Sequence, residues 1–292
     1  MSGEPRRAGL ARGPVLILGS GGMLGRAWGR LLDREGLPGR RLDLPEFDLT
    51  RPEHLQRAVT RDFPLVVNCA AYTDVDGAEA NEAAAAEVNA AGVGRLALRC
   101  RELSLTLVHY STDFVFDGEA RRPYQPEDRP NPVNAYGRTK LQGEAAVAAS
   151  GCAHLLVRTS WLYAPWCRNF VAVIADAARK KPALRVVSDQ TGRPTSAEHL
   201  AAATLRLLAA GALGLWHVTD GGQCTRLEMA ARIAAAVNPG CRVESCATSE
   251  FPRPARRPAF SVLDISRTEE FLGKMPRWED NLDDVVRRLE RP

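Results

Sequence analysis

Short runs of apolar residues alternate along this chain with longer stretches in which apolar residues recur at helical spacing. Continuous apolar runs between helices are typical of parallel strands that are buried on both faces of a sheet. The runs lie at residues 15–18, 40–44, 63–70, 105–111, 154–161, 183–189 and 214–220, and the main helical stretches lie at 23–34, 82–103 and 134–149. The pattern predicts an α/β fold with a doubly wound parallel sheet.

The later part of the chain changes character. Two helix starts there have the residues of capping boxes, Thr195 with Glu198 and Thr225 with Glu228. A proline-rich segment at 250–258 then interrupts the pattern before a final helix. These features predict a smaller C-terminal α+β lobe. The expected division is a flexible N-terminal arm at 1–13, a larger domain at 14–160 and 183–217, and the smaller lobe at 161–182 and 218–292.

The composition narrows the class of protein. The 292 residues are 45% hydrophobic, which is enough to bury a full core. The 39 basic and 35 acidic residues are mixed along the chain, so no basic stripe predicts binding to nucleic acid. Seven cysteines include no CxxC pair, which disfavours a disulfide framework or a zinc site. No segment approaches the roughly 20 apolar residues of a membrane-spanning helix, and no signal peptide is recognisable, so we predict a cytoplasmic location.

A glycine-rich loop, GSGGMLG, follows the first predicted strand and precedes the first helix. Its glycines, Gly19, Gly22 and Gly25, suit a tight turn, close approach of a pyrophosphate to the backbone, and close packing of helix on strand. The helix N-terminus adds free N–H groups and a positive dipole end. In this context the loop predicts a Rossmann-type site for a dinucleotide cofactor.

Asp43 lies near the end of the second predicted strand, where an acidic residue can accept hydrogen bonds from an adenosine ribose. Arg40 and Arg41 beside it could instead favour a 2'-phosphate, so the choice between NADH and NADPH stays open. Asp43 could also be a turn residue at a strand end. Asp48 and Leu49 could contact the adenine, although the start of a helix is an alternative explanation for them.

Tyr136 and Lys140 lie four residues apart in a predicted helix, so a phenol and an ammonium share one face. A nearby cation favours the phenolate and so lowers the pKa of a tyrosine toward a range useful for proton transfer. Thr112, at the carboxyl end of the fourth strand, could supply a third hydroxyl, because ligands gather there in doubly wound sheets. His109 and His217 lie in predicted strands and are expected to be core residues.

Seven motifs together resemble one enzyme family. They are GSGGMLG, NCAAYTDVDGAE, HYSTDFVFDG, NAYGRTK, RTSWLYA, DQTGRPT and RRPAFSVLD, and they cover nearly the whole chain from Val15 onward. In this order the motifs are similar to those of the dTDP-4-dehydrorhamnose reductases, in the extended short-chain dehydrogenase/reductase superfamily. The glycine loop and YxxxK specify only the superfamily, whereas RTSWLYA and DQTGRPT point to the reductase group.

The resemblance implies transfer of hydride from NADH or NADPH to the C4 ketone of dTDP-4-dehydro-6-deoxy-L-mannose, which gives dTDP-L-rhamnose. By this resemblance Tyr136 protonates the forming alkoxide, Lys140 holds the nicotinamide ribose and lowers the pKa of Tyr136, and Thr112 polarises the carbonyl. The cofactor site would comprise Gly19, Gly22, Met23, Leu24, Gly25, Asp43, Asp48, Leu49, Ala70, Ala71 and Tyr72 with Tyr136 and Lys140.

The resemblance also implies a site for the nucleotide sugar. A tryptophan can stack on a sugar face and a guanidinium can grip a diphosphate, which makes Trp161 and Arg257 candidates together with Asp113 and Asn169. The structural alternatives are core packing for Trp161, loop solvation for Asn169 and a solvated charge cluster for Arg257 with Arg253 and Arg256. Relatives can carry Mg²⁺, but no residues with metal-ligand spacing are found to place it. A homodimer is plausible by family analogy.

Three other kinds of protein have sequences similar to this one. Related dehydratases follow Ser-Thr-Asp with a glutamate for elimination, whereas Phe114 stands at that place here, which disfavours a dehydratase. A sister reductase for another nucleotide 4-keto-6-deoxysugar would have the same Tyr, Lys and Thr. A non-catalytic regulatory protein similar to the regulatory subunit of methionine adenosyltransferase would share the fold, but the tryptophan of RTSWLYA and the whole of DQTGRPT favour an enzyme.

Overall fold

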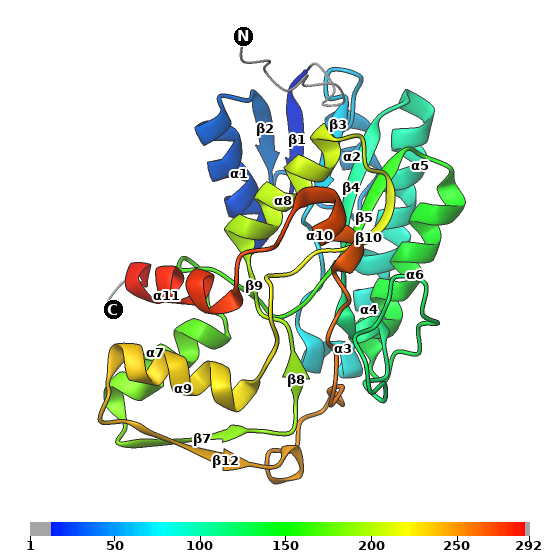
Figure 1. Cartoon of the computed structure of the whole chain (residues 1–292). Helices are drawn as coiled ribbons and strands as arrows, with labels where there is room; N and C mark the ends of the chain where they lie inside the picture. The colour runs from blue at the N-terminus through cyan, green and yellow to red at the C-terminus, as the bar shows by residue number, and fades with distance from the viewer. Residues whose placement is uncertain (1–12, 290–292) are drawn as a thin grey trace.

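The computed structural model describes residues 13–289 and comprises two parts, a larger α/β domain and a smaller lobe below it in Figure 1. Of the predicted N-terminal arm, only Gly13 lies within the described residues. Six parallel strands form the sheet of the larger domain, in the order β10-β5-β4-β3-β1-β2. The strands are β1 (Val15–Leu18), β2 (Gly39–Leu42), β3 (Leu65–Asn68), β4 (Thr106–Thr112), β5 (His154–Thr159) and β10 (Gly214–His217). The doubly wound parallel sheet predicted from the sequence is therefore confirmed.

Helices cover both faces of this sheet because alternate strand residues point to opposite sides. Val15 and Ile17 of β1 pack in one core with α1 and α8, whereas Leu16 and Leu18 pack in a second core with α2, α5 and α6. These helices are α1 (Met23–Glu35), α2 (Pro52–Ala58), α5 (Val93–Leu103), α6 (Ala135–Ser150) and α8 (Ala197–Ala209). The continuous apolar character of the strands follows from this burial on both faces.

The helix predicted over 82–103 exists, but it is not regular. It consists of α4 (Glu82–Ala86), a π-helical turn η1 (Glu87–Gly92) and α5, and the short helix α3 (Val75–Ala80) precedes it. The π-helical turn contains Asn89, which is fully buried. Such turns frequently occur at functional sites because the extra residue redirects a side chain.

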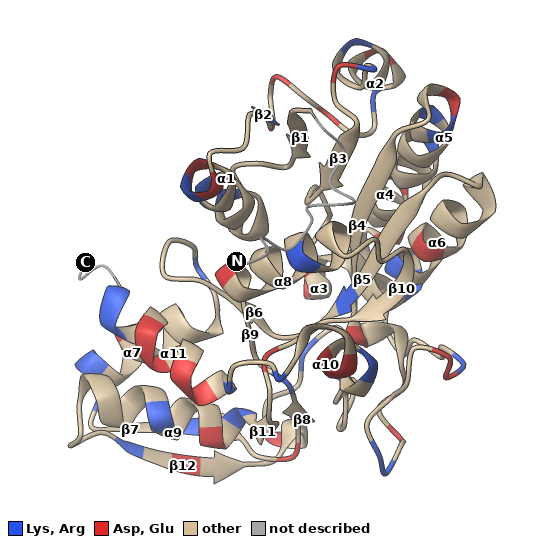
Figure 2. Cartoon of the chain, turned by 45° about the horizontal axis from the view of Figure 1, so that its top comes forward, with Lys and Arg blue, Asp and Glu red and all other residues tan. Residues whose placement is uncertain are grey.

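The smaller lobe has its own core, formed by helices on two short sheets. Its helices are α7 (Phe170–Lys180), α9 (Arg226–Val237) and α11 (Trp278–Arg288), and its strands are β7 (Ala183–Val187) with β12 (Arg242–Cys246) and β8 (Thr191–Gly192) with β11 (Cys224–Thr225). A fourth sheet joins β6 (Leu162–Tyr163) to β9 (Thr195–Ser196), and two 3-10 turns lie at η2 (Asp113–Val115) and η3 (Thr248–Glu250). Basic and acidic residues are interspersed over both parts (Figure 2), and Arg288 of α11 binds both carboxylate oxygens of Glu198 on α8.

The predicted domain boundaries were wrong in two places. Residues 183–187 were expected in the larger domain, but β7 pairs with β12 in the smaller lobe. Conversely, α10 (Ser266–Leu272) was expected in the smaller lobe, yet it contacts α8 and β10. A short apolar run does not specify which sheet it joins, because pairing is decided by the tertiary fold.

Of the two predicted capping boxes, one is present. Thr225 caps α9: its hydroxyl accepts the N–H of Glu228, and the Glu228 carboxylate accepts the N–H of Thr225. The box at Thr195 was wrong, because Thr195 lies in β9 and α8 begins one residue after Ser196. Pairing with β6 keeps Thr195 extended.

Candidate active site

The glycine loop connects β1 to α1 at the carboxyl edge of the sheet. A side chain at Gly19, whose φ is +76°, would place Cβ 2.5 Å from the backbone N of Ala70, and a Cβ at Gly25 would lie 2.1 Å from the carbonyl oxygen of Gly19. Both positions therefore require glycine for steric reasons. Gly22 precedes the first turn of α1 and, with Met23 and Leu24, lines a cavity of about 530 Å³.

Asp43 follows β2 directly and contacts the glycine loop. Its carboxylate accepts hydrogen bonds from the backbone N–H groups of Gly21, at 2.5 Å, and Leu44, at 2.8 Å. The neighbouring arginines have other partners: Arg40 binds Glu46, and Arg41 binds Asp33 and the Gly29 carbonyl. The end of β2 thus carries a carboxylate beside two arginines that are already paired.

Asp48 and Leu49 do not line this cavity. The Asp48 carboxylate accepts hydrogen bonds from the backbone N–H and the hydroxyl of Thr50, and these bonds hold its pKa below the usual value. The Leu49 side chain is buried in the core on the α2 side of the sheet. These contacts favour the alternative explanation, in which both residues belong to the turn that starts α2.

The three residues expected to be catalytic lie in the cavity together. Thr112 is the last residue of β4, and Tyr136 and Lys140 belong to the first turns of α6; all three line the cavity of about 530 Å³ with Ala70 and Ala71. Tyr72 does not line it.

Asn89 holds the segment after β3 in place. Its side-chain amide accepts the N–H of Tyr72 and donates to the Tyr72 carbonyl and to the Thr139 hydroxyl, so it ties this segment to α6.

Burial controls the ionisation of Tyr136. Removal from water raises the pKa of the Tyr136 phenol, the negative charge of Asp113 raises it further, and a hydrogen bond with Thr112 acts in the opposite direction. Phe114 packs edge-on against its ring, with the two centroids 6.1 Å apart. The phenol is therefore protonated at neutral pH.

Lys140 has different partners from those expected. Its ammonium donates a 2.6 Å hydrogen bond to the Tyr110 carbonyl and lies 3.5 Å from Nε2 of His109. Burial lowers the pKa of Lys140 to about 8, although the charge of Glu144 opposes this shift. Lys140 is not among the causes that shift the pKa of Tyr136 here, which are burial, Asp113 and Thr112.

Asp113 is a buried carboxylate in the same cavity. It is 2% exposed, and burial raises its pKa to about 6 despite hydrogen bonds that favour the charged form. Its Oδ1 accepts the hydroxyl hydrogen of Thr112 at 3.0 Å, whereas Oδ2 has no hydrogen-bond partner among the described residues. A buried oxygen without a partner is costly and can bind a polar ligand group.

Trp161 also lines the cavity, on a backbone with φ of +47°. Such a conformation is unusual for a large side chain and is often found at functional sites. A Cβ at Gly192 would lie 2.5 Å from the Trp161 ring, so the glycine of DQTGRPT allows the ring to pack there. The guanidinium of Arg226 lies over the ring, with Cζ 3.5 Å from the centroid.

Asn169 lines the cavity but has a structural role. Its side-chain oxygen caps α7 by accepting the N–H groups of Val171 and Ala172, and its amide nitrogen donates to the carbonyls of Ala164 and Cys167. An asparagine side chain offers two donors and two lone pairs, and these bonds use all four. The expected contact of Asn169 with substrate is therefore not supported.

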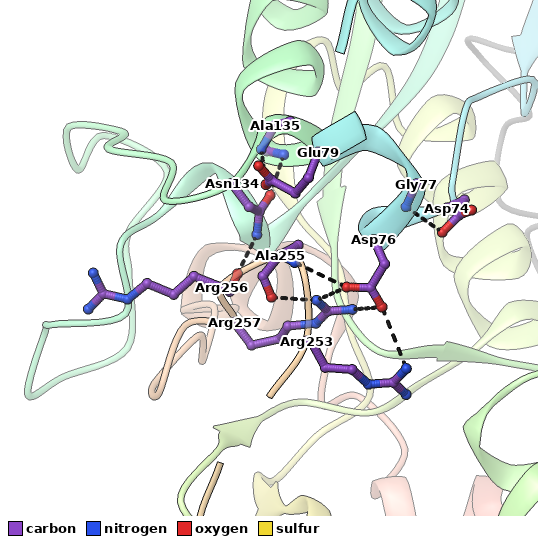
Figure 3. Close-up of polar contacts among 11 residues, drawn as sticks. Asp74, Asp76, Gly77, Glu79, Asn134, Ala135, Arg253, Ala255, Arg256 and Arg257 are labelled. Atoms are coloured by element: carbon purple, nitrogen blue, oxygen red, sulfur yellow. Dashed lines mark hydrogen bonds and ion pairs between the residues drawn. The ribbon is translucent and has the colours of Figure 1, made fainter. Parts of the chain in front are cut away.

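A second, larger cleft of about 880 Å³ adjoins the cavity, and Arg257 lies in it rather than in the catalytic cavity. Figure 3 shows the Arg257 guanidinium on both carboxylate oxygens of Asp76 and the Arg253 side chain approaching the same carboxylate. The hydrogen bonds from Arg257 hold the pKa of Asp76 below its usual value. Arg257 thus fastens the proline-rich segment 250–258 to α3.

The same segment is fastened to α6, the helix that carries Tyr136 and Lys140. Asn134 caps α6 by accepting the Gly137 N–H, and its amide nitrogen donates to the Arg256 carbonyl at 2.8 Å (Figure 3). Glu79 of α3 accepts the N–H of Ala135. The cleft wall and the helix that carries Tyr136 and Lys140 are therefore linked through one side chain.

The structure gives no support for a metal centre or a histidine base. Within residues 13–289, no group of three or more His, Cys, Asp or Glu side chains could hold a metal ion. His109 and His217 are each 1% exposed, and burial lowers the pKa of both, as expected for neutral core residues. Among the same residues, no helix is long and apolar enough to cross a membrane.

The sequence of the whole chain is similar to known reductases. It is 40% identical to the dTDP-4-dehydrorhamnose reductase of Burkholderia thailandensis, over 94% of this chain and 98% of the relative. It is also 40% identical to a probable dTDP-4,6-dihydroxy-2-methyloxan-3-one 4-ketoreductase of Streptomyces antibioticus, over 86% and 87% of the two chains. The crystal structure of the dTDP-4-dehydrorhamnose reductase of Bacillus anthracis in complex with NADP superposes with a TM-score of 0.89 at 32% identity, over 94% of this chain and 99% of that one.

A doubly wound sheet, a glycine loop at its carboxyl edge and a Tyr–Lys pair in the adjoining cavity define an NAD(P)H-dependent oxidoreductase of the short-chain dehydrogenase/reductase type. The motifs had predicted this class. More narrowly, the chain belongs to the family described as RmlD substrate binding domain, whose profile matches residues 13–291.

Proposed function

We propose that this protein reduces the C4 ketone of dTDP-4-dehydro-6-deoxy-L-mannose to dTDP-L-rhamnose. The main support is the meeting of Thr112, Tyr136 and Lys140 in one cavity beside the glycine loop. The similarity of the whole chain to dTDP-4-dehydrorhamnose reductases supports the identity of the sugar nucleotide.

The residues of the cavity have distinct roles in this reaction. The bound nicotinamide supplies a hydride to the carbonyl carbon. The Thr112 hydroxyl, which donates to Asp113 in the free protein, turns to donate its hydrogen bond to the carbonyl oxygen, and Tyr136 transfers its phenolic proton to that oxygen as negative charge develops on it. The raised pKa of Tyr136 suits this direction, because a proton donor must be protonated at the working pH. Lys140 holds the nicotinamide ribose from α6.

The end of β2 favours NADH over NADPH. A 2'-phosphate would meet the Asp43 carboxylate, and the arginines beside it already bind Glu46 and Asp33. A ribose 2'-hydroxyl could instead donate to Asp43. We therefore expect a higher kcat/KM with NADH, and we expect Asp43→Ala to reduce this preference.

The test is oxidation of NADH or NADPH, followed by absorbance, with dTDP-4-dehydro-6-deoxy-L-mannose and with other nucleotide 4-keto-6-deoxysugars. Fastest turnover of the first substrate is the expected result. Faster turnover of another sugar nucleotide would favour a sister reductase, which the equal identity to the Streptomyces antibioticus ketoreductase makes the second candidate. Binding of cofactor without oxidation by any of these substrates would contradict both.

A further inference from the structure

Arg226 lies where the two cavities meet. It is the first residue of α9, directly after the capping residue Thr225, and it lines both the catalytic cavity and the larger cleft. Only one other residue, Phe170, lines both among the described residues. A substrate with its ketone at Tyr136 and its nucleotide in the larger cleft has to pass this side chain.

We propose that Arg226 binds the diphosphate of the nucleotide sugar and so sets how far the sugar reaches toward Tyr136. This assignment rests on the proposed function for the nature of the substrate. Arg226 takes the place that the sequence had suggested for Arg257.

Aromatic rings hold the Arg226 guanidinium without using its N–H groups. Its Cζ lies 3.5 Å from the centroid of Trp161 and 4.8 Å from the centroid of Phe170. Stacking of this kind fixes the plane of the guanidinium and leaves its edge available. Its side chain has no hydrogen-bond or ion-pair partner among residues 13–289, so its five N–H donors are not engaged by other side chains or by the backbone there.

Of the other arginines that line the cleft, Arg185, Arg253 and Arg257 are paired with carboxylates, whereas Arg256 has no such partner among residues 13–289. Arg257 donates two hydrogen bonds to Asp76, and Arg185 binds Glu250. Burial lowers the pKa of Arg226 to about 10, which leaves it protonated at neutral pH; the charge of Asp113 opposes this shift and the charge of Arg257 adds to it. A partly buried cation without a hydrogen-bonded partner is unfavourable, and a bidentate anion would satisfy it.

The position of Arg226 also indicates what the Trp161 ring contacts. The sequence suggested that this ring stacks on the sugar, but Arg226 already covers one face of it. Gly192 packs against the ring edge, since a Cβ there would lie 2.5 to 2.8 Å from ring atoms. Trp161 therefore positions Arg226, and the sugar contacts whatever part of the ring remains exposed.

The test measures binding of dTDP and of thymidine to the full chain by isothermal titration calorimetry. We expect Arg226→Gln to weaken dTDP binding by about 10- to 100-fold, as for loss of a charge-assisted hydrogen bond, and to leave thymidine binding unchanged. Arg226→Lys keeps the charge and should lose less affinity than Arg226→Gln. The matched control is Arg232→Gln, which removes an exposed arginine from the same helix, outside both cavities, and should bind dTDP like the unaltered chain.

Three results would overturn the assignment. The first is an unchanged dTDP affinity in Arg226→Gln, and the second is an equal loss of affinity for dTDP and for thymidine in that variant. The third is that the unaltered chain binds none of dTDP, UDP and ADP. If UDP or ADP binds instead and Arg226→Gln weakens that binding, the role of Arg226 stands and the proposed sugar nucleotide is wrong. Thermal unfolding and NADH binding of each variant show whether the fold is intact. If Arg226→Gln does not fold, Arg226→Lys decides, because unchanged dTDP affinity in that variant would contradict a bidentate contact.

Discussion

The pKa values of charged groups shift in opposite directions in the cavity that holds Tyr136 and in the adjoining cleft. In the cavity, Asp113 and Lys140 are buried, and their pKa values shift toward the neutral forms. In the cleft, Asp76 and Arg257 form a bidentate pair, and the pKa of Asp76 shifts toward the charged form. The cavity thus disfavours the charged forms of its buried groups, whereas the ion pair of Asp76 and Arg257 fastens the wall of the cleft.

The largest expected effect is on the cavity. Tyr136→Phe removes the phenolic proton but retains the ring that packs against Phe114. We expect kcat to fall by about 10²- to 10⁴-fold, the usual contribution of general acid catalysis, with little change in KM. Steady-state oxidation of NADH measures both constants. Binding of NADH to the variant is the control, and full turnover by Tyr136→Phe would disprove the proposed proton donor.

The next largest expected effect is on the stability of the fold, which burial of the ionised Asp113 carboxylate lowers. The folded pKa of Asp113 is about 6, above the ordinary value of 3.8, so the folded state binds this proton more tightly than the unfolded state. The cost of ionising Asp113 therefore appears as pH rises from 3.8 through 6 and is complete above pH 7. We expect Asp113→Asn to increase the free energy of unfolding at pH 7.5 by roughly 3 kcal/mol and by less at pH 5.

Urea denaturation of both proteins at the two pH values measures this difference. The matched comparison is Asp76→Asn, because the folded pKa of Asp76 is lowered and its ionised form stabilises the fold. That variant should lose stability at pH 7.5. If Asp113→Asn were destabilising at both pH values, the carboxylate would be a structural group rather than a strained one.

The smallest expected effect is on the cleft. Asp76→Asn removes the ion pair with Arg257. The Asp76 side chain is 26% exposed and the Arg257 side chain 20%, so the loss should cost about 1 kcal/mol of stability. Loss of this anchor should also raise KM for the sugar nucleotide by about threefold to tenfold, because segment 250–258 forms the wall of the cleft. A lower KM would show instead that the freed Arg257 binds the substrate.

Much of the cavity could be predicted because its residues depend on local rules. The glycine loop, the strand-end Thr112 and the i, i+4 pair of Tyr136 and Lys140 are short patterns whose geometry follows from the strand or helix that carries them. The carboxyl ends of parallel strands lie on one edge, so the fold class alone brings them together.

For other residues the structure shows partners that the sequence analysis did not predict. Arg257 was expected at the substrate, but Asp76, far away in the sequence, binds it. Asn169 was expected to contact substrate, but its own helix uses its amide. The run that forms β7 was expected in the larger sheet, but it pairs with β12 in the smaller lobe, and no local pattern distinguishes the two sheets.

The sequence by itself determined the parallel sheet, the glycine loop and the pairing of Tyr136 with Lys140 on one helix, because periodicity, steric limits on glycine and helical spacing act within a few residues. Only the tertiary structure decided the ionisation of these groups and the partners of the arginines. Burial raises the pKa of Tyr136 and Asp113 and lowers that of Lys140, and Asp76 pairs with Arg257. Desolvation and long-range pairing are properties of the packed chain, so no short stretch of sequence contains them.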